Sequence, residues 1–280
     1  MHSSLPKRKP NSRRNLDMAL QRRFGAGASL IQTRTAMAAT IIGQMLPGAV
    51  FKGGTSLRIR YGRGGSRNTI DCDVARKGDL DSFVREARAS LAAGWLGFSA
   101  TIVAKRPARP KDVPAAYVMQ PFEVKMVYLG GAWCTLPLEV GFNEIGLANE
   151  ADMVCPAADI VELFTELGFP EPAPIPLMPL AWQVAQKLHG VTEPGNDRVR
   201  DLADLQLILK DGALDMKRVL EICKRLFKFR KRQPWPPKVT KGVRWDELYE
   251  SLRGDLPVLP TVGEAIVWAN DLIARIDAAE

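Results

Sequence analysis

A proline-rich segment, residues 171–179, separates two parts of the chain that differ in hydrophobic pattern. Proline lacks a backbone N–H and interrupts helices, so we expect this segment to be an extended linker outside any helix or central strand. Residues 15–170 mix helical spacing with strict alternation, whereas residues 180–280 show only helical spacing. The sequence therefore predicts an α/β (α+β) core with a small mixed sheet, then a mainly helical C-terminal lobe, with a flexible basic arm at residues 1–14.

The composition narrows the class of protein. The 280 residues are 46% hydrophobic and 25% charged, which is enough apolar material to bury a substantial core. No apolar run approaches the roughly 18 residues of a membrane span, and residues 1–14 lack the apolar centre of a signal peptide. We therefore expect a cytoplasmic protein with no membrane contact. The four cysteines are scattered along the chain, which disfavours a structural zinc site.

Hydrophobic spacing predicts the individual elements of the core and of the helical lobe. Two helices between residues 15 and 45 should be joined at Gly25 and Gly27. Alternation predicts a β-hairpin that turns at Gly130-Gly131, with strands over residues 122–128 and 136–142. Further strands are expected at residues 49–52, 68–75 and 101–105, and further helices at residues 55–61, 81–96, 180–190, 200–209, 216–227 and 263–278.

Two carboxylates stand two residues apart in the strand predicted at residues 68–75. Asp71 and Asp73 should project from one face, while Ile70, Cys72 and Val74 face the other side. Carboxylates placed in this way can hold a divalent cation together, although the same spacing also occurs on ordinary solvated strands. The acidic pair alone is therefore weak evidence for a metal site.

A Gly-Gly-Thr-Ser turn at residues 53–56 precedes the acidic pair, between a predicted strand and a predicted helix. The free N–H groups and hydroxyls at such a helix start suit phosphate oxygens, but the same residues would also serve as a plain helix cap. A phosphate-binding turn followed by an Asp-x-Asp strand is an arrangement that phosphoryl-transfer chemistry can use. The two features together favour that chemistry.

The order of these motifs resembles a known family. The run Lys52-Gly53-Gly54-Thr55-Ser56-Leu57, followed by Arg67-Asn68-Thr69-Ile70-Asp71-Cys72-Asp73, resembles the signature of the AbiEii/AbiGii nucleotidyltransferase toxins. These are the toxin half of type IV toxin–antitoxin and phage-defence systems, within the DNA polymerase β-like superfamily. A later stretch also resembles the family, with Lys187 on one helix and an Arg-Asp-x-x-Asp-Leu helix over residues 200–205. Cys72 and Asn68-Thr69 depart from the usual pattern without removing a ligand.

The resemblance implies that the chain moves a nucleoside monophosphate from an NTP to a hydroxyl. Mg²⁺ (or Mn²⁺) would be held by Asp71, Asp73 and a third acid, for which Glu139 on the polar face of the predicted hairpin is the first candidate and Glu123 the second. Either glutamate could equally be an ordinary exposed strand carboxylate. The residues expected to bind the nucleotide and its phosphates are Lys52, Gly53, Gly54, Thr55, Ser56, Arg67, Lys187, Asp201 and Asp204.

A strongly basic segment follows in the predicted helical lobe. Residues 224–244 contain nine lysines and arginines and no acid, interleaved with Phe227, Phe229 and Trp235. Such mixing suits nucleic acid, a docking surface for an acidic antitoxin, or a solvated face. Some members of the resembling family modify the 3′ end of tRNA, so tRNA or another RNA is the expected acceptor, with Lys228, Arg230, Lys231 and Arg232 as contacts. The alternatives are nucleotidyl transfer to a protein and a non-catalytic binding protein.

Overall fold

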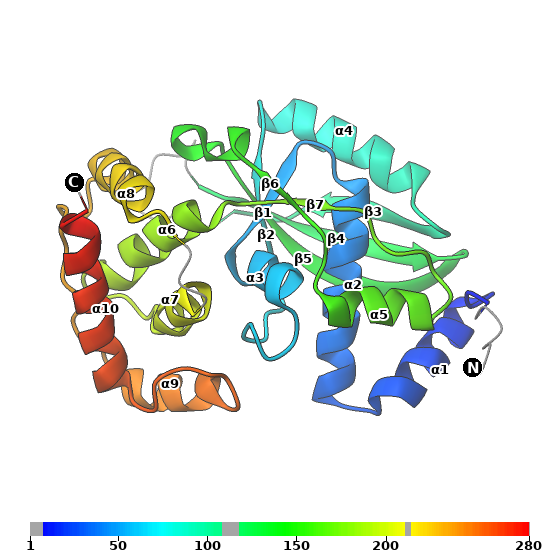
Figure 1. Cartoon of the computed structure of the whole chain (residues 1–280). Helices are drawn as coiled ribbons and strands as arrows, with labels where there is room; N and C mark the ends of the chain where they lie inside the picture. The colour runs from blue at the N-terminus through cyan, green and yellow to red at the C-terminus, as the bar shows by residue number, and fades with distance from the viewer. Residues whose placement is uncertain (1–7, 108–117, 211–213, 280) are drawn as a thin grey trace. The chain divides into compact units, whose positions relative to one another are not determined.

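A computed structural model describes residues 8–107, 118–210 and 214–279. The chain divides into two compact units, shown in Figure 1. The first extends to Gly62 and resumes at Asn68–Leu177, and the second consists of Arg63–Arg67 and the chain from Met178 onward. In the part of the chain that the structure describes, no helix has the length and apolar character needed to cross a bilayer.

The first unit is built on a seven-stranded mixed sheet with strand order β3-β4-β5-β2-β1-β7-β6. Its long β4–β5 hairpin and the β3–β4 pair are antiparallel, whereas β2 runs parallel to β5 and β1 runs parallel to β7. The strands are β1 (Ala49–Lys52), β2 (Cys72–Arg76), β3 (Phe98–Ala104), β4 (Gln120–Tyr128), β5 (Gly131–Gly141), β6 (Asp152–Val154) and β7 (Ile175–Leu177).

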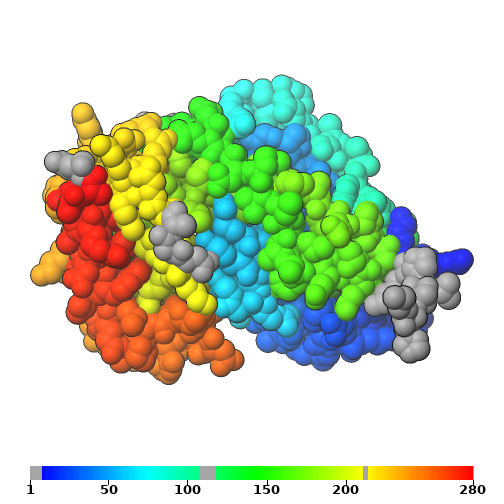
Figure 2. Space-filling model, in the orientation of Figure 1, coloured from blue at the N-terminus to red at the C-terminus, as the bar shows by residue number. Residues whose placement is uncertain are grey.

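Four helices pack with the sheet around one hydrophobic core: α1 (Arg13–Phe24), α2 (Ala28–Met45), α4 (Leu80–Ala93) and α5 (Ala158–Glu166). The core joins apolar side chains of these helices to alternate strand residues, among them Phe51, Val74 and Leu138, which are fully buried. Outer side chains of α4 and α5 lie at the surface of this unit (Figure 2). Because strand side chains alternate between faces, the residues next to these core positions are directed to the opposite face of the sheet.

Two further elements of the first unit follow directly on strands β1 and β5. Helix α3 (Gly53–Tyr61) begins directly where β1 ends, and a short 3-10 helix (Glu144–Asn149) follows β5. Asp79 caps α4 by accepting a hydrogen bond from the backbone N–H of Ser82 at 2.8 Å, which explains why that helix begins at Leu80.

The second unit is helical, with α6 (Leu180–Thr192), α7 (Arg200–Leu209), α8 (Met216–Arg230), α9 (Trp245–Arg253) and α10 (Val262–Asp277). Its core contains fully buried aromatic side chains, including Trp182, Trp245 and Tyr249. Helix α10 begins with a capping box, in which the side chains of Thr261 and Glu264 each bond the other residue's backbone N–H.

The mixed α/β fold agrees with the sequence prediction, as do the two N-terminal helices, the central hairpin and four of the C-terminal helices. Several details were wrong or missed. Residues 13 and 14, predicted as part of a flexible arm, belong to α1, because Ser12 accepts a hydrogen bond from the backbone N–H of Asn15 and caps the helix. Residues 1–7 lie outside the described residues. Helices α5 and α9 and strand β6 were not predicted.

The proline-rich segment is extended, but part of it is not outside the sheet as expected. Residues 175–177 form β7, which pairs with β6 on one side and β1 on the other. The prolines alternate with Ile175 and Leu177, both fully buried, so the segment follows the period of a strand. Pro176 is tolerated because β7 has only three residues and shares a single aligned pair, Phe51 with Leu177, with β1.

Candidate functional site

Three charged residues lie side by side across three neighbouring strands. Lys52 on β1 is in register with Asp73 on β2, and Asp73 is in register with Glu139 on β5. Residues paired in this way direct their side chains to the same face of a sheet. We call Lys52, Asp73 and Glu139 the charged row; it lies on the face opposite the core formed by Cys72, Val74 and their neighbours.

Asp71 lies just before β2 and is not part of the strand, contrary to the sequence prediction. Its side chain is exposed, and Ile70, predicted on the apolar side, is 63% exposed. Only Cys72 and Val74 of the predicted apolar side are buried. The alternating sequence pattern therefore began three to four residues before the strand, and Asp71 approaches the charged row from the loop that leads into β2.

Glu139 and Glu123, the two candidates for the third acid, have different surroundings. Partial burial raises the pKa of Glu139, and the negative charges of Asp73 and Asp71 raise it further, against a lowering by Lys52. Glu123 instead accepts a hydrogen bond from Lys105 at 2.9 Å, and this bond lowers its pKa. The structure thus brings Glu139 together with the aspartates and commits Glu123 to a surface ion pair.

Gly53 holds the start of α3 close to Asp73. Its φ of +63° lies in the left-handed region, and a Cβ at this position would collide with Oδ2 of Asp73. The first N–H groups of a helix project outward at its N-terminus, where they and the helix dipole favour anions. The predicted Gly53-Gly54 turn therefore sets a helix start directly beside the charged row.

The hydroxyls of Thr55 and Ser56 already have partners inside the first unit. Thr55, which is 3% exposed, donates its hydroxyl hydrogen to the backbone carbonyl of Asp71. Ser56 is fully buried and donates to the carbonyl of Gly53 at 2.9 Å. The two hydroxyls therefore fix the backbone at Asp71 and at Gly53. This is the structural role in a helix cap or turn that the sequence also allowed, in place of direct contact with phosphate.

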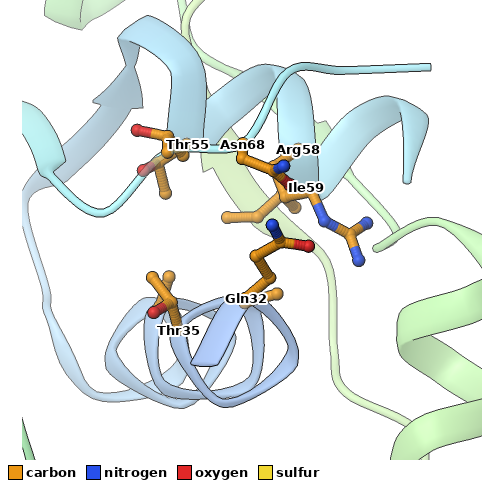
Figure 3. A pocket seen from close by; sticks show the side chains of 9 residues that line it. Gln32, Thr35, Thr55, Arg58, Ile59 and Asn68 are labelled. Carbon is orange, nitrogen blue, oxygen red and sulfur yellow. The ribbon is translucent and has the colours of Figure 1, made fainter. Parts of the chain in front are cut away.

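A small polar cavity borders Thr55 (Figure 3). It lies between α2, which contributes Gln32 and Thr35, and α3, which contributes Thr55 and Arg58. Arg58 is held by an ion pair with Asp159 at 2.8 Å. No residue of the charged row lines this cavity, so it is separate from the acidic site.

A second group of predicted site residues forms a buried charge network in the helical unit. The ammonium of Lys187 on α6 lies 3.1 Å from Asp201 and 2.6 Å from Asp204, both on α7. Arg67 reaches Asp204 at 3.1 Å, and Arg198 reaches Asp201 at 2.8 Å. Lys187, Asp201 and Asp204 are almost completely buried, so these charges depend on one another for stabilisation.

Lys187 is charged within this network. Burial lowers the pKa of Lys187, but Asp204 and Asp201 outweigh this effect and the net shift is upward. Lys187 is therefore a protonated lysine whose ion pairs join α6 to α7.

The basic segment divides into two environments. Lys228, Lys231 and Arg232 line a surface pocket together with Lys224 and Trp235, whereas the guanidinium of Arg230 lies 3.4 Å from Nδ1 of the buried His189. Lys224 was not among the predicted contacts. Its spacing of four and seven residues from Lys228 and Lys231, which places all three on one side of α8 and its end, was the available signal.

The two carboxylates of the charged row are oxygen donors of the type that hard divalent cations prefer. In residues 8–107, 118–210 and 214–279, no three histidine, cysteine, aspartate or glutamate side chains converge to form a closed metal cage. Mg²⁺ is usually held by one or two carboxylates together with waters and substrate phosphates, and it does not need such a cage. Asp73 and Glu139, in register and with Asp71 close enough to raise the pKa of Glu139, match that requirement.

Comparisons with known proteins identify a family and similar folds. The family model for the nucleotidyl transferase AbiEii toxin of type IV toxin–antitoxin systems matches residues 36–266. The structure is similar to MenT4, a nucleotidyltransferase toxin from Mycobacterium tuberculosis, with TM-score 0.51 and 17% identity over 94% of this chain and 97% of that one. JHP933 from Helicobacter pylori gives TM-score 0.44 and 16% identity over 88% and 90% of the two chains. No curated protein matches the sequence.

Proposed function

The chain belongs to the AbiEii family of nucleotidyltransferase toxins of type IV toxin–antitoxin systems, and from that premise we propose that it transfers a nucleoside monophosphate from an NTP to the 3′-terminal hydroxyl of a tRNA. Nucleotidyl transfer and a cognate antitoxin follow from the family itself. The metal, the acceptor and the roles of individual residues are our proposals.

The charged row is the observation that carries the proposal. The site offers surroundings that are complementary to a metal-bound triphosphate. It has two acids on adjacent parallel strands, a lysine beside them, and a helix start that Gly53 holds close to Asp73. The carboxylates suit a divalent cation, whereas Lys52 and the first N–H groups of α3 suit phosphate oxygens. Burial, and then the negative charges of Asp73 and Asp71, raise the pKa of Glu139, and a bound cation would offset the repulsion between these carboxylates.

Asp71, Asp73 and Glu139 would hold Mg²⁺ or Mn²⁺. When bound, the cation neutralises negative charge that develops on the phosphate oxygens during transfer. The acceptor hydroxyl oxygen forms a bond to the α-phosphorus of the NTP, the bond between this phosphorus and the pyrophosphate oxygen breaks, and pyrophosphate leaves. Glu139 would accept the proton of the hydroxyl, while Lys52 and the backbone of Gly53 and Gly54 would bind the leaving phosphates.

We propose, from the resemblance to the family, that Lys187 and Arg67 contact the nucleotide phosphates. Asp201 and Asp204 then position these cations, because each aspartate bonds one or both of them. Thr55 and Ser56 support phosphate binding indirectly, by fixing the backbone from which the α3 N–H groups project.

The acceptor assignment rests on charge. The sequence carries a net charge of +8, and residues 224–244 contribute nine cations without an acid. A polyanionic acceptor such as tRNA fits this distribution better than an average protein side chain does. Transfer to a protein hydroxyl uses the same acids and remains the second candidate, and a role in phage defence is part of the proposal through the family.

One experiment tests the activity and the acceptor together. Wild-type and Asp73→Asn protein are incubated with total tRNA, each α-labelled NTP in turn, and Mg²⁺, Mn²⁺ or EDTA, and RNA and protein products are separated on a gel. We expect label on tRNA from wild type only, and only with added metal. Label on protein would move the acceptor to a polypeptide. Equal growth arrest by wild-type and Asp73→Asn protein in cells would contradict a catalytic toxin.

A further inference from the structure

A surface pocket at the end of α8 combines positive charge with an aromatic ring. Lys224 and Lys228 lie on the last turns of the helix, and Lys231 follows as its C-cap in the left-handed conformation, with φ +54°. This turn directs the next residues back across the helix end, so that Trp235 lines the same pocket. We call this site the α8 pocket, defined by Lys224, Lys228, Lys231, Arg232 and Trp235.

The charge of the basic segment is concentrated at the α8 pocket. Downstream, Lys241 and Arg244 form ion pairs with Asp246 and Glu247. Within the part of the chain that the structure describes, no carboxylate forms an ion pair with Lys228 or Lys231, and Arg232 meets Glu193 only at 3.4 Å. The negative end of the α8 dipole favours cations at its last turn, but it does not explain why they surround a hollow containing an indole ring.

Trp235 is held in a fixed orientation. Its indole N–H donates to Asp277 at 2.8 Å, and its ring meets Phe227 edge-on with centroids 5.3 Å apart. Phe227 is almost completely buried, so it acts as support, whereas the half-buried Trp235 remains partly accessible. A planar ring that is already ordered loses little entropy when a nucleobase stacks on it.

We propose that the α8 pocket binds single-stranded RNA, with an unpaired base on Trp235 and the adjoining phosphates on Lys228 and Lys231. An acidic protein segment would use the lysines but would have no need of the fixed ring, so the combination favours RNA. The α8 pocket would thus be a contact for an unpaired part of the RNA acceptor. The inference rests on the proposed function in one respect, namely that the acceptor is RNA.

Binding is measured by fluorescence anisotropy with a labelled single-stranded RNA of twelve nucleotides, a duplex of the same sequence, and an oligoglutamate of similar charge. All proteins carry Asp73→Asn, so that no transfer occurs during the titration. The test variant is Lys228→Gln with Lys231→Gln. The matched control is Lys210→Gln with Lys217→Gln, two exposed lysines of the same unit outside the pocket.

We expect the pocket variant to bind the single strand about tenfold more weakly. The slope of log K against log salt should also fall by about 1.4, because the variant neutralises two fewer RNA phosphates and each contributes ~0.7 to the slope. The control should bind like its parent. Trp235→Leu should weaken binding about tenfold, whereas Trp235→Phe, which also lacks the bond to Asp277 but keeps a ring, should retain most of it. Thermal unfolding of each variant shows whether it is folded.

Equal binding by the pocket variant and the control would overturn the inference. The inference would also be overturned if the duplex bound as tightly as the single strand and neither depended on Trp235. Binding of oligoglutamate with the same dependence on Trp235 would instead assign the pocket to an acidic protein. Failure of the inference is separable from failure of the proposed function. If the pocket substitutions are made in a chain that retains Asp73 and tRNA is still labelled normally, only the pocket is rejected. If the wild-type chain binds RNA but labels nothing, only the transfer is rejected.

Discussion

Asp73 and Glu139 occupy aligned positions on the parallel strands β2 and β5, although 65 residues separate them in the sequence. The alignment places two carboxylates on one face at the centre of the sheet, where Lys52 on the other side of Asp73 completes the charged row. A substitution at one of these acids should therefore affect transfer more than stability, because the row lies opposite the hydrophobic core.

Glu139→Gln should lower kcat for nucleotidyl transfer by roughly 10²- to 10⁴-fold, the usual contribution of a positioned acid or base. Glu123→Gln is the matched control, because Glu123 is a strand glutamate of the same hairpin that pairs with Lys105. It should keep nearly the wild-type rate. Rates measured with labelled NTP at saturating tRNA decide the assignment, and a Glu123→Gln defect as large as that of Glu139→Gln would reverse it.

Gly53→Ala should abolish most of the transfer activity, because the added methyl group must displace the carboxylate of Asp73. Gly48→Ala provides the control: Gly48 also has a positive φ, +71°, but nothing lies within 4 Å of the added Cβ. Both variants should lose about 1–2 kcal/mol of unfolding free energy from backbone strain, and only Gly53→Ala should lose activity. Denaturant unfolding and transfer assays on both proteins separate the two effects.

Thr55→Val should reduce both stability and transfer, because the carbonyl of Asp71 loses the hydroxyl that bonds it. The hydroxyl of Thr69 still donates to this carbonyl at 3.4 Å, so the expected loss is that of one ordinary hydrogen bond, about 0.5–1.5 kcal/mol. Thr55→Ser keeps the hydroxyl and should restore kcat. If Thr55→Val transfers at the wild-type rate, the hydrogen bond does not position Asp71.

Lys187→Met should destabilise the protein by about 3–5 kcal/mol, since it leaves Asp201 and Asp204 in a buried site with less compensation. Adding Asp204→Asn should recover part of this loss by removing one of the two negative charges. Lys217→Met, at an exposed position, should stay within about 0.5 kcal/mol of wild type. Urea unfolding measures all three, and a stable but inactive Lys187→Met protein would show that Lys187 acts on the nucleotide and not on the fold.

His189 should make stability depend on pH between about 7.5 and 5.5. Burial, together with Arg230, Arg198 and Arg232, lowers its pKa in the folded protein to about 3, against about 6.5 when unfolded. Below pH 6.5 the unfolded chain therefore binds a proton that the folded protein does not, and stability falls as pH falls. The expected loss is about 1.4 kcal/mol between pH 7.5 and 5.5.

The pH effect has a clear control. His189→Asn should flatten the dependence of unfolding free energy on pH over this interval, because the sequence contains only one other histidine, His2, which lies outside the described residues. Equal pH slopes for the two proteins would mean that His189 titrates normally in the folded state.

Strands β1 to β5, most helices and the two aspartates of the site could be predicted from the sequence because their signals are local. Alternation indicated that Glu139 faces the polar side of the hairpin, and the Gly-Gly turn indicated a helix start. Local patterns contain no information on which strands pair, so the alignment of Glu139 with Asp73, and the choice between Glu139 and Glu123, required the structure.

The wrong predictions for individual residues also have physical explanations. The exposure of Ile70 and the position of Asp71 before β2 could not be read from alternation, because a loop leading into a strand can continue its period. The burial of Lys187 was hidden because its partners, Asp201 and Asp204, lie on a different helix. Arg230 looked like its basic neighbours in the sequence, yet it contacts His189 because it lies on another side of α8.

The short segment Arg63–Arg67 belongs to the helical unit although both of its neighbours in the chain belong to the first unit. The polypeptide therefore crosses between the units three times, and Arg67 supplies one of the ion pairs of Asp204. A gene fragment starting at residue 178 lacks this partner, so the helical unit is not a self-contained module. Recombination at a single junction could not exchange it between relatives without leaving Asp204 mismatched, and the two halves of such a protein are constrained to evolve together.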